Sequence, residues 1–107
     1  VQRISGKIET TDQHTVRGKI IYDLDEAFTC EVLDGEYNGI KYRIPFYLID
    51  MIEPLGDEKA YIFLKNRQEL ILDDHADVDE DNKGCLIETG KREYVYIPWK
   101  KIKRISL

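Results

Sequence analysis

The chain has 107 residues, of which 42% are hydrophobic and 35% charged, and its net charge is −5 at pH 7. This length suits one domain, or two very small units that share a core. The acidic balance argues against nucleic acid as the default partner, because phosphate binding needs a basic surface. No run of about eighteen apolar residues occurs, so no membrane-spanning segment is predicted.

The N-terminal half of the chain alternates apolar and polar residues with the period of β-strands. Between residues 15 and 24, Val16, Gly18 and Ile20 fall on one face, and Arg17 and Lys19 fall on the other. The same reasoning predicts strands over 4–10, 15–24, 28–33, 40–46 and 49–53. Turns are predicted at 34–35 and 38–39, where Gly follows Asp or Asn. A single helical turn is predicted at 47–48, directly after the strand that ends near Pro45.

The C-terminal half repeats this order. Strands are predicted over 60–64, 69–73, 84–88 and 93–97, with turns at 66–67 and 89–91. Residues 99–107 are expected to supply a closing turn and strand. No window of eleven or more residues keeps a helical period, so no long helix is expected. Short helices over 46–52 and 99–105 remain the alternative to the closing strands, because isoleucines recur there at three-residue spacing.

One motif occurs twice in the chain. Residues 44–53 read IPFYLIDMIE and residues 97–106 read IPWKKIKRIS, so each copy begins with Ile-Pro-aromatic. Phe46 then corresponds to Trp99 at an offset of 53 residues, and the isoleucines that follow keep the same offset. The motif predicts an internal duplication in which each Pro ends one strand and the residues after it form the next.

The repeated order resembles that of SH3-like or Sm-like small-barrel repeats. The segments GKIIYDLDEAF, LDGEYNGIKYRIPF and DVDEDNKG also resemble an uncharacterised bacterial tandem-repeat family, and the resemblance covers nearly the whole chain. It implies an all-β fold of two similar five-stranded barrels, packed as one pseudo-symmetric unit. The repeats would be residues 1–54 and 55–107. The resemblance implies a fold and no mechanism.

The long acidic loop over 73–84 is the strongest candidate for a chemical role. Counted from Asp77, carboxylates fall at positions 1, 3, 5 and 12, which are Asp77, Asp79, Asp81 and Glu88. This is the ligand spacing of an EF-hand-type Ca²⁺ loop. Asn82 replaces the usual Gly, however, Glu88 falls in a predicted strand and no helices flank the loop. A solvated acidic loop is the alternative, and residues 23–26 could mirror the loop more weakly.

Two further features concern binding partners. Lys100, Lys101, Lys103 and Arg104 follow Trp99 and could form a nucleic-acid patch, or simply the outward face of a strand. The aromatic residues could line a peptide-binding groove or pack in the core. An exposed ring, if there is one, is expected at Tyr37, Tyr47 or one of Tyr94 and Tyr96. We therefore predict a non-catalytic interaction or structural module that binds protein or peptide. A Ca²⁺-stabilised accessory domain is the alternative, and a nucleic-acid-binding barrel is the weaker one.

Catalysis has little support in the sequence. The two histidines, His14 and His75, fall in polar loops, and no Gly-rich phosphate loop or activated nucleophile pattern is present. The two cysteines, Cys30 and Cys85, are too few for a Cys-rich zinc site. They are predicted to be small, buried and reduced, with a disulfide between the halves as the alternative. No enzymatic activity and no catalytic residue are predicted.

Overall fold

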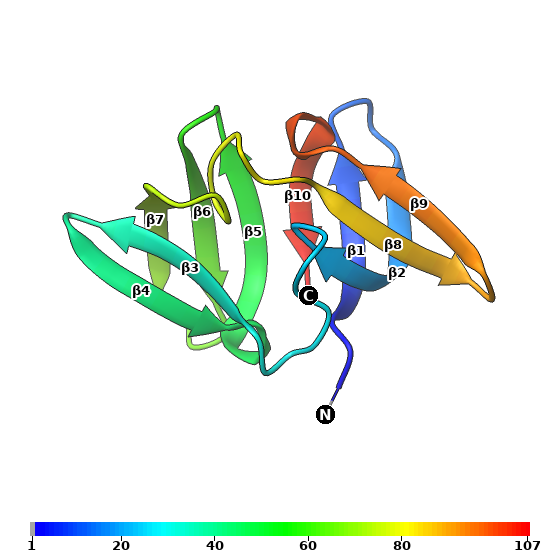
Figure 1. The fold of residues 1–107 in the computed structure, drawn as a ribbon, viewed down its shortest axis with the longest axis horizontal. Coiled ribbons are helices and arrows are strands. Elements are labelled where there is room, and N and C mark those ends of the chain that lie inside the picture. Colours follow the sequence, from blue (N-terminus) through cyan, green and yellow to red (C-terminus); the bar gives the residue numbers. More distant parts are fainter. Residues whose placement is uncertain (1) are drawn as a thin grey trace.

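The computed structural model describes residues 2–107 as ten strands and two single-turn 3₁₀ helices (Figure 1). The strands are β1 (Ser5–Thr10), β2 (Thr15–Tyr22), β3 (Val32–Tyr37), β4 (Ile40–Pro45), β5 (Ile49–Leu55), β6 (Lys59–Leu64), β7 (Glu69–Asp73), β8 (Cys85–Gly90), β9 (Glu93–Ile97) and β10 (Ile102–Ser106). The helices are η1 (Phe46–Leu48) and η2 (Trp99–Lys101). The prediction of an all-β fold without a long helix is confirmed.

All the strands belong to one open antiparallel sheet, in the order β4-β3-β7-β6-β5-β10-β1-β2-β8-β9. Figure 1 shows two curved halves that meet where β5 lies beside β10. One half contains β3 to β7, and the other contains β8 to β10 together with β1 and β2. The sheet does not close, and two separate five-stranded barrels are not confirmed. The division into repeats 1–54 and 55–107 stays a prediction, and in the sheet β1 and β2 lie in the same half as β8 to β10.

Most predicted strands match the structure, and β7 and β9 have the predicted bounds. The strand predicted over 28–33 is wrong, because β3 begins at Val32 and continues through the predicted turn at Asp34-Gly35. A side chain at Gly35 would meet Leu72, since its Cβ would lie 2.7 Å from the Leu72 Cβ. Gly35 therefore allows β3 to pack closely against β7, and the reversal occurs only at Asn38-Gly39. The predicted turn at 89–91 likewise begins later, because β8 extends to Gly90.

The two Ile-Pro-aromatic motifs have the same local structure. Pro45 and Pro98 each precede a 3₁₀ turn whose first residue is a buried aromatic side chain. The predicted helical turn and closing strands are confirmed at both places. Phe46 and Trp99 both pack on Tyr22, with ring centroids 5.2 Å and 6.1 Å from its ring. These three aromatic rings form the centre of the core, and the internal duplication stays a prediction.

Gly18 lies where β2 passes close to β8. A Cβ atom at Gly18 would lie 2.0 Å from the carbonyl oxygen of Glu88, and Gly18 also has a φ of +154°. We expect Gly18→Ala to lower the free energy of unfolding by about 2–3 kcal/mol, because the two backbones would have to separate. Denaturant unfolding measures this loss.

Gly56→Ala is the matched control for Gly18→Ala. Gly56 has a φ of +68° but nothing within 4 Å of its built Cβ. This variant should therefore cost only the backbone strain, about 1 kcal/mol. Equal losses in the two variants would show that the close approach of β2 and β8 does not limit residue 18.

Candidate functional site

The four residues predicted as Ca²⁺ ligands have different surroundings in the structure, and their role in binding Ca²⁺ stays a prediction. Asp77 is buried, with 3% of its surface exposed, and its Oδ2 accepts the backbone N–H of Asp34 at 2.8 Å. Asp79 accepts the N–H of Asp81 at 2.9 Å, and both lie on the outer side of the loop. Glu88 lies in β8 and pairs with Arg3 at 3.8 Å. Among residues 2–107, every cluster of three potential metal ligands includes Asp77, and none includes Asp79, Asp81 or Glu88.

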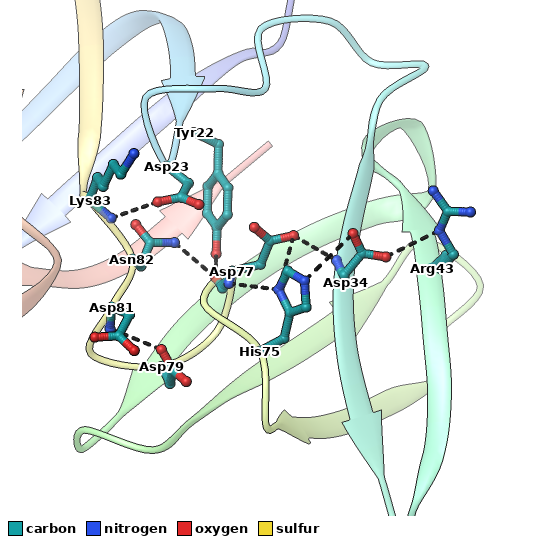
Figure 2. Close-up of polar contacts among 10 residues, drawn as sticks. All are labelled: Tyr22, Asp23, Asp34, Arg43, His75, Asp77, Asp79, Asp81, Asn82 and Lys83. Atoms are coloured by element: carbon teal, nitrogen blue, oxygen red, sulfur yellow. Dashed lines mark hydrogen bonds and ion pairs between the residues drawn. The ribbon is translucent and has the colours of Figure 1, made fainter.

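The backbone of Asp77 is fixed from two sides (Figure 2). The hydroxyl of Tyr22 donates to the carbonyl oxygen of Asp77 at 2.5 Å, and the side chain of Asn82 donates to the same oxygen at 2.8 Å. The Asn82 carbonyl oxygen in turn accepts the N–H of Gly84 at 2.7 Å. Asn82 therefore closes the loop through buried hydrogen bonds.

Two groups of potential metal ligands share Asp77. One contains Asp34 and His75, and the other contains Asp23 and Glu26; in each, the ligand atoms lie within 4.8 Å of one another. His75 Nδ1 accepts the N–H of Asp77 at 3.0 Å and lies 3.7 Å from its Oδ2. Asp23 accepts the N–H of Lys83 at 2.6 Å. The carboxyl group of Asp77 thus lies between the segment that follows β2 and the start of β3.

Burial changes the acidity of two of these carboxyl groups. Burial is the main cause that raises the pKa of Glu26 from 4.5 to about 8, and nearby Asp77 and Asp25 add to the shift. Burial also raises the pKa of Asp77 from 3.8 to about 6, although the Asp34 N–H and His75 oppose this rise. Both shifts have the same origin, because a charged carboxylate loses hydration in this position.

A separate, open acidic cleft of about 490 Å³ lies on the outer side of the same loop. It is lined by Glu36, Asp57, Glu58, Lys59, Asp73, Asp74, Asp79, Glu80 and Asp81. Contact with Asp74 raises the pKa of Glu36, because the two carboxyl groups share a hydrogen bond. The sequence showed the acidic loop but did not show that Glu36 of β3 and Asp57 and Glu58 of the turn before β6 also line this cleft.

The basic residues after Trp99 divide into one that is paired with carboxylates and three that are exposed. Arg104 Nε donates to Glu53 at 2.6 Å, and its Nη1 lies 3.3 Å from Glu9, so its charge is balanced by two carboxylates within the sheet. Lys100, Lys101 and Lys103 are exposed, whereas Ile102 and Ile105 are buried.

The two cysteines lie in different environments, and both are free. Cys85 is buried, and burial raises the pKa of its thiol to about 12. Cys30 is exposed, so the prediction that both would be buried is wrong for this residue. Cys30 lies in the irregular connection before β3, where the predicted strand does not form.

The aromatic side chains divide into a core group and an exposed group. The four tyrosines named as candidates for exposure are all exposed: Tyr37, Tyr47, Tyr94 and Tyr96 are 43%, 53%, 55% and 53% exposed. Two of them, Tyr94 and Tyr96, lie on β9 on either side of Val95, which is also exposed. The hydroxyl of Tyr96 donates to the carbonyl oxygen of Lys83 at 2.6 Å, which connects β9 to the acidic loop. β9 therefore presents an apolar, hydrogen-bonded surface at the end of the sheet.

No known protein family, curated protein or solved structure matches the chain. The resemblance to tandem small-barrel repeats therefore stays a prediction. No helix within residues 2–107 is long and apolar enough to cross a membrane.

Proposed function

We propose that the protein is a non-catalytic interaction module that binds an extended peptide segment along the free edge of β9. The observation that carries this proposal is an unprotected sheet edge. β9 is the last strand in the sheet, and Glu93, Tyr94, Val95 and Tyr96 are all exposed. Alternate residues of an edge strand direct their N–H and C=O groups away from the sheet, where an added strand can bind them.

The other edge of the sheet is protected in ways that β9 is not. β4 has the charged side chains of Lys41 and Arg43 within the strand, and a proline bounds each edge strand, Pro45 in β4 and Pro98 after β9. Charges and proline on an edge strand discourage pairing with another strand. In β9 the charged residue is Glu93 at the first position, and the exposed residues Tyr94, Val95 and Tyr96 that follow it are uncharged. The two edge strands thus differ in the charges along their length, which influence whether another strand can be added.

The charges around β9 indicate the chemistry of its partner. The turn before β9 contains the exposed residues Lys91 and Arg92, and the helix after it contains the exposed residues Lys100 and Lys101. A matching peptide has apolar residues in its middle, to pack on Tyr94 and Tyr96, and acidic residues at its ends. Main-chain hydrogen bonds would provide affinity, and the tyrosine side chains would provide selectivity.

The test uses a synthetic peptide of alternating Val and Thr with Asp at both ends, together with a copy methylated on alternate backbone nitrogens. Binding to the full chain is followed by calorimetry. We expect Tyr94→Lys to weaken binding by about tenfold or more and the methylated peptide not to bind, because each change blocks strand addition.

Tyr47→Lys is the matched control for this test, since Tyr47 is as exposed as Tyr94 but lies in η1. It should leave peptide binding unchanged. Equal binding of the methylated and unmethylated peptides, or an equal loss with Tyr47→Lys, would contradict the proposal.

A further inference from the structure

Asp23, Glu26 and Asp77 bring three carboxyl groups together between the two halves of the sheet. Asp23 and Glu26 follow β2, and Asp77 lies in the segment between β7 and β8. We propose that these three residues bind a Ca²⁺ ion. This site is distinct from the β9 edge, and it differs from the loop spacing of an EF-hand because two of its ligands come from a distant segment of the chain.

The arrangement of oxygen atoms fits one ion. One oxygen from each carboxyl group lies within 4.8 Å of the others. Two ligands on opposite sides of Ca²⁺ are separated by about 4.8 Å, because each Ca–O distance is about 2.4 Å. All three side chains offer oxygen, which hard cations such as Ca²⁺ and Mg²⁺ prefer, and none offers the nitrogen or sulfur that Zn²⁺ favours.

Glu26 supplies an independent reason to place an ion here. Its side chain is directed into the group, only 9% of the residue is exposed, and its Oε2 has no hydrogen-bond partner. Buried polar atoms in folded proteins nearly always have a partner. Among the ion pairs within residues 2–107, none involves Asp23 or Glu26. A bound cation would supply both the missing partner of Oε2 and the missing positive charge.

The second group around Asp77 lacks this feature. Asp34 pairs with Arg43 at 3.2 Å, and the Nδ1 atom of His75 accepts the N–H of Asp77 (Figure 2). Its polar atoms therefore have protein partners already. The open acidic cleft contains Asp79 and Asp81 but shows no buried atom that lacks a partner. We therefore place the ion at the group of Asp23, Glu26 and Asp77, where a buried carboxylate oxygen lacks a protein partner.

An ion at this position would connect distant parts of the sheet. Its ligands Asp23 and Glu26 fix the segment after β2, and Asp77 also accepts the N–H of Asp34 in β3. Because β2 and β3 lie in different halves of the sheet, the ion would restrict movement of one half relative to the other. Binding to the folded chain alone then stabilises the fold by mass action.

The test uses the full chain after removal of metal with a chelator. Calorimetric titrations with CaCl₂, MgCl₂ and ZnCl₂ measure affinity, and thermal melting measures stability. We expect Ca²⁺ to bind with a stoichiometry of one and to raise Tm by roughly 10 °C at about a hundredfold excess over Kd. Glu26→Gln keeps the size of the side chain but removes its charge, and it should weaken Ca²⁺ binding by at least about tenfold.

Asp81→Asn is the matched control, because Asp81 belongs to the same loop but not to the proposed site. It should bind Ca²⁺ as the unmodified chain does. Loss of binding in Asp81→Asn but not in Glu26→Gln would overturn the proposal in favour of the outer loop. Absence of Ca²⁺ binding at millimolar concentration, or tighter binding of Mg²⁺ or Zn²⁺ than of Ca²⁺, would also overturn it. None of these results depends on whether β9 binds a peptide.

Discussion

Replacing Trp99 by alanine is expected to lower the free energy of unfolding by about 3–5 kcal/mol. Trp99 is 4% exposed and packs perpendicular to Tyr22, which is itself buried against Phe46. The substitution would leave a cavity beside the aromatic centre of the core, where the sheet has little freedom to collapse. Denaturant unfolding followed by circular dichroism measures the loss.

Two further variants define the cause of this loss. Trp99→Phe keeps an aromatic ring and sacrifices no hydrogen bond, because the buried Nε1 of Trp99 has no partner. It should cost clearly less than the alanine variant, about 1–2 kcal/mol. Tyr47→Ala removes an exposed ring from the equivalent turn and should change stability by less than about 0.5 kcal/mol. A loss below about 1 kcal/mol in Trp99→Ala would show that Trp99 is not part of the folding core.

The stability of the metal-free chain is expected to fall as pH rises from about 5 to 8. The folded state raises the pKa of Glu26 from 4.5 to about 8, so over this interval the folded chain keeps a proton that the unfolded chain has released. This contribution to stability is complete below the unfolded pKa and is lost as the pH rises through the folded pKa. The loss is on the order of 2–4 kcal/mol.

Glu26→Gln isolates this effect from the titration of other groups. Glutamine is neutral at every pH, so the variant should match the unmodified chain near pH 5 and exceed its stability at pH 8. Urea unfolding at both pH values, with a chelator present, measures the difference. If the unmodified chain and the variant had the same pH profile, Glu26 would titrate normally in the folded state.

Much of the fold follows from local sequence. Period-two alternation predicted β2, β7 and β9, and the two Ile-Pro-aromatic motifs predicted where β4 and β9 end. These features are local, because proline ends hydrogen bonding wherever it occurs and alternation reflects one buried face. The third strand was misplaced because Asp34-Gly35 has the composition of a turn. In the folded chain, Gly35 instead provides space for Leu72, which is far away in sequence.

The candidate sites were only partly predictable. The sequence showed two acidic segments, at 23–26 and 73–84, and Asp77 was among the predicted ligands. It did not show that Glu26 is buried beside Asp77 or that Asp79 and Asp81 face outward. One of the two tyrosines of β9 was a candidate for exposure, but the position of both at a free edge depends on strand order.

By itself, the sequence determined the class of fold, the approximate positions of most strands and the turns after the two Ile-Pro-aromatic motifs. Local alternation and proline chemistry are sufficient for these, because each depends on neighbouring residues. Only the tertiary structure decided that the strands form one open sheet, that β9 is an unprotected edge and that Glu26 meets Asp77. Pairing between strands depends on contacts between residues far apart in the chain, and such contacts leave no periodic signal in the sequence.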